Sequence, residues 1–234
     1  MKEKMQVLGV ELDNCTAKYA MKRVVEYVKL ERINVVEMVT MNTLARFQQS
    51  EESREIFETF DLALPSDRGI LQAAGVKEEW RLKEVDEFLF IKMVMRYLQK
   101  NRIRVFLLAE TQSSLQKLED YIQEEYGNLR IIESASLEER GSSDDMLLNL
   151  VNGAEAECVL STLPSPVEEY FISRNKSLVN ARIWLGFGHL INEIKKEKRG
   201  FEKVKDFLLR KILQKEVEKE RRKNDIVNND SIEN

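Results

Sequence analysis

The sequence is poor in the residues on which several common chemistries depend. Its 234 residues include one histidine, His189, and two cysteines, Cys15 and Cys158, which lie far apart in the chain. A cysteine–histidine zinc site and a disulfide framework both need more of these residues, so the composition excludes them. Catalysis by a serine or cysteine nucleophile with a histidine base would have to use His189.

Glycine and the common phosphate motifs are also scarce. The chain has nine glycines, about 4% of its residues against a usual ~7%. It contains no G-x-G-x-x-G, no G-x-x-x-x-G-K-[ST] and no D-x-D that would hold a nucleotide-bound metal. We therefore expect neither a Rossmann dehydrogenase nor a P-loop NTPase, and we predict no metal and no cofactor.

Long apolar runs are missing as well. No stretch reaches the roughly 18 apolar residues of a membrane-spanning helix, and the first residues lack the apolar segment of a signal peptide. Two unpaired cysteines fit a reducing compartment. We expect a cytoplasmic protein.

Charge is divided unevenly along the chain. Residues 195–223 hold 13 basic and 6 acidic residues, so the other 24 basic and 35 acidic residues leave the rest of the chain at −11. A basic segment on an acidic body suggests contact with something anionic, and the alternative is a solvated amphipathic helix. We expect no nucleic acid, since the body lacks interleaved basic and aromatic residues.

Apolar runs rich in β-branched residues alternate with segments of helical period, which predicts an α/β fold with a mostly parallel, Rossmann-like sheet and helices on both faces. The expected strands are Gln6–Val10, Ile33–Thr40, Leu62–Leu64, Arg104–Leu108, Leu129–Ile132, Cys158–Leu163 and Ile183–Phe187. The expected helices are Thr16–Leu30, Glu51–Phe60, Gly69–Ala74, Val85–Leu98, Ser113–Tyr126, Asp144–Val151 and Pro166–Asn175. We divide the chain into an α/β domain (1–194), a basic amphipathic helical appendage (195–223) and a disordered tail (224–234).

Polar loops follow several of the expected strands, and all three prolines lie in such loops. In open parallel sheets ligands bind at the carboxyl ends of the strands, so these loops predict a pocket there. The residues concerned are Thr40, Asn42, Ser66, Asp67, Arg68, Ser165, Glu168, Glu169, Gly186 and Gly188. Each also has an ordinary alternative as a turn or helix-cap residue.

The order of these loops resembles the WecG/TagA/CpsF glycosyltransferases, glycosyltransferase family 26, over about residues 6–214. Seven segments resemble family motifs in the same order. They are Leu8–Thr16 (LG-x-x-x-D-N-x-T), Thr40–Asn42 (T-x-N), Phe60–Gly69 (A/S-D-L-V-L-P-D-G-x-G), Arg81–Asp86 (R-V-x-G-x-D), Val105–Ala109 (V-F-L-L-G), Ser165–Ile172 (S-P-K-Q-E-x-F/W-I) and Gly186–Asn192 (G-V-G-G-x-F-D).

The resemblance implies transfer of an N-acetylhexosamine, of the N-acetylmannosamine type, from a UDP-sugar to a polyprenyl-diphosphate-linked acceptor at the inner face of the plasma membrane. Such products are cell-surface polysaccharides, capsule or teichoic acid. Members of the family invert the anomeric centre without a D-x-D metal. A homo-oligomer stays an open alternative.

The resemblance also assigns roles to residues. It implies catalysis by Asp67 as base with Thr40 and Ser66, and it places membrane or acceptor contacts in the basic appendage at Lys198, Arg199, Lys203 and Arg210. The residues it implies for substrate binding are Asn42, Arg81, Asp86, Ser165, Glu168, Glu169, Gly186 and Gly188.

This chain departs from the family pattern at two loops. Ser66 stands where the family has the proposed aspartate base, and Asp67 comes one position later. Val167 and Glu168 replace a lysine and a glutamine, which removes a positive charge from the expected diphosphate site. The alternative hypothesis is therefore a catalytically degenerate family member that acts as a binding or regulatory partner.

Overall fold

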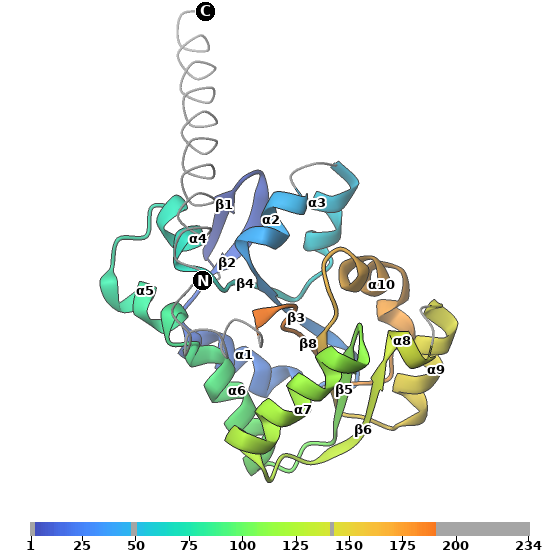
Figure 1. Cartoon of the computed structure of the whole chain (residues 1–234). Helices are drawn as coiled ribbons and strands as arrows, with labels where there is room; N and C mark the ends of the chain where they lie inside the picture. The colour runs from blue at the N-terminus through green and yellow to red at the C-terminus, as the bar shows by residue number, and fades with distance from the viewer. Residues whose placement is uncertain (1–2, 48–50, 141–142, 191–234) are drawn as a thin grey trace, which may run out of the picture.

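The structure is a computed structural model that describes residues 3–47, 51–140 and 143–190 (Figure 1). The predicted basic appendage (195–223) and the predicted disordered tail (224–234) lie outside the described residues. The description below therefore concerns the predicted α/β domain.

Six parallel strands form the central sheet in the order β4–β3–β8–β7–β5–β6 (Figure 1). Their bounds are β3 (Asn34–Val39), β4 (Leu62–Pro65), β5 (Val105–Ala109), β6 (Ile131–Ser136), β7 (Cys158–Thr162) and β8 (Ile183–Gly186). Strands β3, β5, β7 and β8 are buried along their whole length, as strands covered on both faces must be. The predicted α/β class with a mostly parallel sheet is confirmed.

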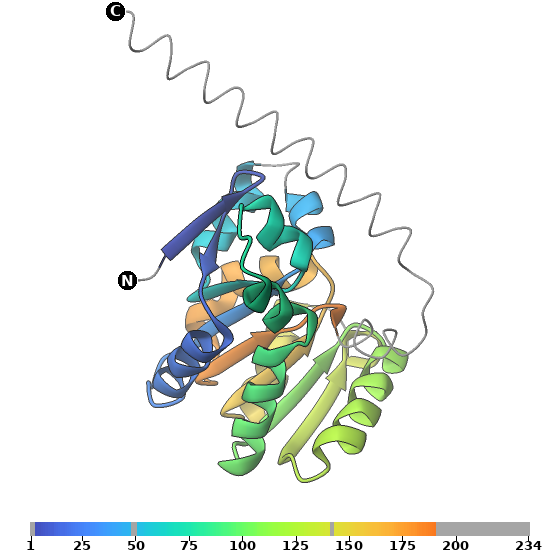
Figure 2. The same cartoon turned by 90° about the vertical axis from the view of Figure 1, so that its left-hand side faces the viewer.

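Helices cover both faces of this sheet (Figures 1 and 2). The helices are α1 (Ala17–Tyr27), α2 (Met41–Phe47), α3 (Glu51–Glu58), α4 (Arg68–Ala73), α5 (Glu79–Asp86), α6 (Leu89–Lys100), α7 (Gln112–Tyr126), α8 (Leu137–Arg140), α9 (Asp144–Gly153) and α10 (Val167–Asn175). Apolar residues of α1, α6 and α7 pack in one cluster with one face of the sheet. Those of α2, α3, α4, α9 and α10 pack in a second cluster with the other face.

The first expected strand, Gln6–Val10, is wrong in its limits and its pairing. Strands β1 (Glu3–Val7) and β2 (Val10–Asn14) form a separate antiparallel hairpin, and Leu8 and Gly9 between them have φ values of 54° and 72°. Two successive positive φ values are typical of a tight hairpin turn. The hairpin is tied to the sheet because Asp13 Oδ2 accepts a hydrogen bond of 2.8 Å from the Ala63 backbone N–H.

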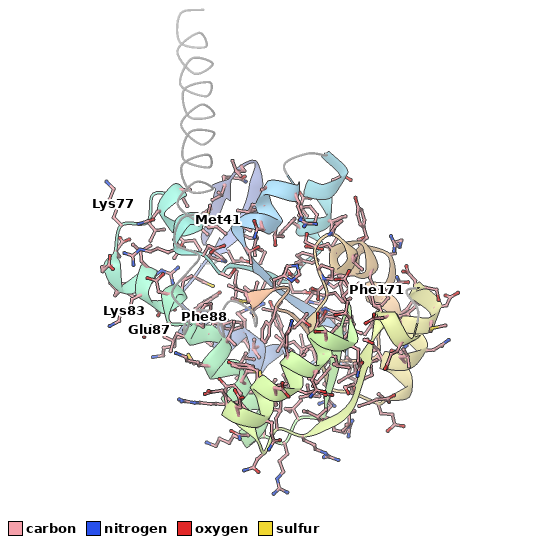
Figure 3. The ribbon with its side chains drawn as sticks, viewed as in Figure 1. Met41, Lys77, Lys83, Glu87, Phe88 and Phe171 are labelled. Carbon is pink, nitrogen blue, oxygen red and sulfur yellow. The ribbon has the colours of Figure 1, made fainter. Side chains whose placement is uncertain are left out.

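The expected helix Val85–Leu98 corresponds mainly to α6, and most of the separate helix α5 before it was not expected. Helix α5 ends at Asp86, and Phe88, with a φ of 51°, precedes α6 (Phe88 is labelled in Figure 3). Neither proline nor glycine marks this break, so the apolar spacing predicts one continuous helix across it. Helices α2 and α8 are short and were not expected from the sequence pattern.

Candidate active site at the carboxyl edge of the sheet

The structure brings several of the expected polar residues to one cavity at the carboxyl edge of the sheet. This cavity has a volume of about 330 Å³, and we call it the edge cavity. Its floor is formed by the buried side chains of Glu37 and Glu169, and its rim carries the exposed residues Asn42, Arg46 and His189. The other residues that line it are Met38, Thr40, Thr43, Ala45, Leu163, Ser165 and Gly188.

Thr40 and Asp67 both hold the start of α2. The Thr40 hydroxyl accepts a hydrogen bond of 3.1 Å from the Thr43 backbone N–H and lies 2.9 Å from the Thr43 hydroxyl. Asp67 Oδ2 accepts a bond of 2.6 Å from the backbone N–H of Met41, which is labelled in Figure 3. Thr40 lines the edge cavity, whereas Asp67 contacts the first turn of α2 and is not among the residues that line the cavity.

Ser66 lies in the turn after β4 but its hydroxyl is already engaged. The side chain is buried, and its Oγ donates a hydrogen bond of 2.8 Å to the Val39 carbonyl. This bond joins the ends of β4 and β3. The structure therefore shows a structural contact for Ser66, and its catalytic role stays a prediction.

Arg81 lies away from the edge cavity. Its Nη1 donates to the Cys15 carbonyl at 2.6 Å and to Glu84 Oε2 at 3.2 Å, and its Nη2 donates to Asn14 Oδ1 at 3.1 Å. The residue is 8% exposed and lines a second cavity of about 380 Å³, the hairpin cavity, together with Asn14, Tyr19, Val76, Glu78 and the exposed Trp80. Arg81 thus holds the loop that follows the hairpin, and the predicted diphosphate contact stays a prediction.

Asp86 is paired with Arg68 and not with Arg81. Arg68 Nη1 donates to Asp86 Oδ2 at 2.6 Å, while its Nη2 reaches Glu79 Oε2 at 2.7 Å. These ion pairs join the first residue of α4 to both ends of α5. The structure does not bring Asp86 to the edge cavity.

Three glutamates meet in the interior beneath the edge cavity. Glu37 of β3 lies opposite Gly186 of β8, and Glu168 and Glu169 open α10. The side chains of Glu37, Glu168 and Glu169 are 3%, 1% and 1% exposed. Glu168 Oε1 accepts a 2.5 Å hydrogen bond from the indole N–H of Trp184, which packs on Phe171 (labelled in Figure 3).

Burial and proximity change the ionisation of these three carboxyls. Burial raises the pKa of Glu168 to about 8, with the Glu169 charge adding to the rise. Burial also raises the pKa of Glu37 well above its usual range, helped by the charges of Glu168 and Glu169, and it raises that of Glu169. A carboxyl of raised pKa can keep its proton near neutral pH, and it ionises more readily when a cation lies beside it.

Gly186 makes room for this cluster. A Cβ at this position would lie 1.9 Å from Glu37 Oε2, 2.7 Å from its Cδ and 3.0 Å from Glu168 Oε1. Only glycine leaves space for the two carboxyls against β8. Gly188, with a φ of 48°, instead shapes the loop that lines the edge cavity.

Sequence reasoning missed Glu37 and Arg46. Glu37 is an acidic residue inside the apolar run Asn34–Val39, and that position was the only signal in the sequence. Arg46 lies on α2, which was not expected, and its Nη1 donates a 2.8 Å bond to the Ser165 carbonyl. This bond joins α2 to the loop before α10 at the rim of the edge cavity.

The last points concern the basic appendage, membrane-spanning helices and metal-binding groups. The expected membrane or acceptor contacts Lys198, Arg199, Lys203 and Arg210 lie outside the described residues. Within residues 3–47, 51–140 and 143–190, no helix has both the length and the apolar content to cross a membrane. In the same part of the chain no group of three metal-binding side chains has a geometry that could hold a metal ion.

Comparison with known protein families gives a match over most of the chain. Residues 5–199 match the model of the glycosyl transferase WecG/TagA/CpsF family. No curated protein matches the chain. The matched region covers most of the hairpin and all six strands of the sheet.

Proposed function

Since the chain belongs to the glycosyl transferase WecG/TagA/CpsF family, we propose that it moves an N-acetylhexosamine from a UDP-sugar to a polyprenyl-diphosphate-linked acceptor. The donor sugar is of the N-acetylmannosamine type, and the product enters a cell-surface polysaccharide, capsule or teichoic acid. The observation that carries this proposal is the edge cavity, which Thr40 and Asn42 line, with the carboxylate of Asp67 bonded to the backbone N–H of Met41 between them in the chain.

The proposed reaction is a single displacement. The acceptor hydroxyl oxygen attacks the anomeric carbon from the face opposite the diphosphate, the bond from that carbon to the diphosphate oxygen breaks, and UDP leaves with the electron pair. Asp67 takes the proton of the attacking hydroxyl, and Thr40 and Asn42 position it. One displacement inverts the anomeric centre, and the chain's own carboxylate supplies the base.

Arg46 is the better placed of two arginines for the donor diphosphate. It is exposed on the rim of the edge cavity, whereas Arg81 is 8% exposed and donates to three oxygens of the protein. A guanidinium group binds phosphate oxygens through two parallel N–H bonds and stays charged at all relevant pH values. We assign the diphosphate to the rim and the acceptor sugar to the floor.

The basic residues 195–223 support a peripheral membrane location. A segment with a surplus of seven positive charges is attracted to an anionic leaflet by about 1 kcal/mol per basic residue near the surface. This location would bring the edge cavity near a lipid-linked acceptor. Sedimentation of the full chain with anionic vesicles, compared with neutral ones, tests it, and equal sedimentation with both would contradict it.

One observation favours the alternative of a catalytically degenerate family member. Ser66, at the family's aspartate position, is buried and bonded to the Val39 carbonyl. If Asp67 does not supply the base, the edge cavity binds a ligand without turning it over. The chain would then act as a binding or regulatory partner of an active transferase.

The two functions are separated by the effect of Asp67→Asn on UDP release in the presence of a lipid-linked amino-sugar acceptor. We expect the wild-type chain to release UDP and the variant to lose at least about 100-fold in rate, because general-base catalysis contributes factors of that order. Asp120→Asn, at an exposed aspartate on α7, is the matched control and should keep the wild-type rate. An Asp67→Asn protein that keeps the wild-type rate contradicts the assignment of Asp67 as the base. A wild-type chain without UDP release supports the alternative of a catalytically degenerate family member.

A further inference from the structure

His189 is the chain's only histidine, and the turn after β8 places it at the rim of the edge cavity. The Leu190 backbone N–H donates a 3.0 Å hydrogen bond to the Phe187 carbonyl, which closes a β-turn with His189 at its tip. Phe187 and Leu190 are both buried at 0% exposure, whereas His189 is exposed. The ends of the turn are thus held in the core, and His189 has a defined place on the rim.

Arg46 reaches over the same part of the rim from a neighbouring loop. It lies on α2, which follows β3, and its Nη1 donates a 2.8 Å hydrogen bond to the carbonyl of Ser165, which follows β7. Strand β8 lies between β3 and β7 in the sheet. The Arg46 side chain therefore spans the carboxyl end of β8, from which the turn of His189 extends. Both residues line the edge cavity.

These two basic side chains have no acidic partner at the rim. Neither Arg46 nor His189 forms an ion pair within the part of the chain that the structure describes. The acidic residues that line the cavity are Glu37 and Glu169, which are buried and whose pKa values are raised by burial. A raised pKa reduces the negative charge that they present near neutral pH. The rim therefore favours an anionic ligand.

A diphosphate has the chemistry to bridge two basic groups across one opening. A guanidinium group binds phosphate oxygens through parallel N–H bonds. An imidazole donates an N–H in either charge state and adds a positive charge when it takes a second proton. The two phosphate groups of one ligand can therefore engage Arg46 and His189 together, above a cavity of about 330 Å³ that has room for a sugar.

We infer that His189 is the second basic contact for the diphosphate of the nucleotide-sugar donor, beside Arg46, and that it stabilises the departing UDP. When the bond from the anomeric carbon to the diphosphate oxygen breaks, the electron pair stays on that oxygen, and an N–H donor held there stabilises the charge. The inference deepens the proposed function and rests on it, because the diphosphate is that of the proposed donor.

The departures of this chain from the family pattern agree with this role. The motif that Gly186–Asn192 resembles has a glycine at the position of His189, so the imidazole is an addition of this chain. The neighbouring loop, after β7, has Val167 in place of a lysine. A basic group is lost after β7 and one is gained after β8, and these strands are adjacent.

The test is titration calorimetry of the full chain near neutral pH with UDP as the probe. We expect His189→Ala to weaken UDP binding by about tenfold, since hydrogen bonds between charged groups are about twice as strong as neutral ones. His189→Arg keeps a positive charge and N–H donors, so its affinity should stay within about threefold of the wild type. Equal UDP affinity of wild type and His189→Ala, or a His189→Arg protein as weak as His189→Ala, overturns the inference.

The matched control removes a basic side chain elsewhere. Lys117 is exposed on α7 and does not line the edge cavity. Lys117→Ala should change UDP affinity by less than about twofold, because salt screens exposed charges that do not contact the ligand. A loss of affinity as large as that of His189→Ala would show an effect of overall charge and would overturn the assigned contact.

Failure of this inference can be told from failure of the proposed function. UDP binding that His189→Ala leaves unchanged, in a chain that releases UDP from a UDP-sugar, overturns the inference and leaves glycosyl transfer in place. Weaker UDP binding by His189→Ala, in a chain that releases no UDP with the lipid-linked acceptor, supports the contact and contradicts the transferase function. A wild-type chain that binds no UDP contradicts both. Calorimetry and the release assay use the same preparation of the protein.

Discussion

The hairpin cavity and the edge cavity each have buried ionisable side chains, and the fold surrounds the two kinds differently. At the hairpin cavity the guanidinium of Arg81 donates three hydrogen bonds to Cys15, Asn14 and Glu84. At the edge cavity the floor carboxylates of Glu37 and Glu169 each keep an oxygen without a partner. The buried guanidinium is hydrogen-bonded within the fold, whereas the buried carboxyls keep oxygens without a partner and have raised pKa values.

This difference separates two kinds of buried polar group. A buried charge that is fully bonded fixes the elements around it, and its removal costs stability. A buried polar atom without a partner costs stability, because it loses its hydration without replacement. The sequence shows Arg81 as a charged residue just before an expected helix and Glu37 as a charged residue inside an apolar run, so only the geometry shows which of them is paired.

The largest effect in this comparison is expected from filling the space that the carboxyls of Glu37 and Glu168 occupy. Gly186→Ala would place a Cβ 1.9 Å from Glu37 Oε2 inside the sheet. We expect the free energy of unfolding in urea to fall by about 3 kcal/mol or more, because overpacking in a tight core costs about 1–3 kcal/mol and a carboxyl must also move.

The matched control for this variant is Gly153→Ala at the end of α9. A Cβ at Gly153 would meet no atom within 4 Å, so its stability should change by less than about 1 kcal/mol. A Gly186→Ala protein as stable as Gly153→Ala would contradict the described packing of Glu37 and Glu168 against β8.

Most of the fold could be predicted from the sequence because buried parallel strands are short apolar runs. The expected strands 33–40, 62–64, 104–108, 129–132, 158–163 and 183–187 overlap the six strands of the sheet. The short helices α2 and α8 were missed, and two further errors lie where the backbone adopts positive φ without a sequence signal, at Leu8 and Phe88. There the packing of the hairpin and of α5 against α6 decides the conformation.

The candidate site was predictable only in part. Thr40, Asn42, Ser165, Glu169 and Gly188 line one cavity, because the carboxyl ends of parallel strands share an edge. Which polar residue faces the cavity and which faces the interior depends on pairing between distant strands. That pairing places Glu37 opposite Gly186 and thereby under the cavity, which a local pattern does not show.

A second way to test the comparison is the pH dependence of stability, because carboxyls without a cation hold their protons. Burial raises the pKa of Glu168 to about 8, so the folded protein keeps a proton that the unfolded chain releases above its ordinary pKa. Between about pH 5 and pH 8 the free energy of unfolding should therefore fall by about 1.4 kcal/mol per pH unit for each such proton.

Urea unfolding over this pH range measures the slope, and variants assign it. Glu168→Gln should make the slope shallower by one proton, with Glu37 and Glu169 accounting for the remainder. Glu110→Gln, at an exposed site, should leave the slope unchanged. Stability that stays constant or rises from pH 5 to pH 8 in the wild type would mean that the three carboxyls are compensated within the fold.

The smallest expected effect concerns the compensated charge at the hairpin cavity. Arg81→Met keeps the length of the side chain and leaves the Cys15 carbonyl and Asn14 Oδ1 without their donor. Because both acceptors are half-buried, we expect the free energy of unfolding to fall by about 1–2 kcal/mol. Lys83→Met on the same helix, where Lys83 pairs with Glu87 on the surface (Figure 3), should change it by less than about 0.5 kcal/mol.

The same variant also separates the two cavities in their function. Arg81 does not line the edge cavity, so Arg81→Met should keep the wild-type rate of UDP release with the lipid-linked acceptor while its stability falls. A UDP-release assay and urea unfolding on one preparation measure both. If Arg81→Met instead lost UDP release at unchanged stability, then Arg81 would contact the substrate, and its three hydrogen bonds within the fold would not be its main role.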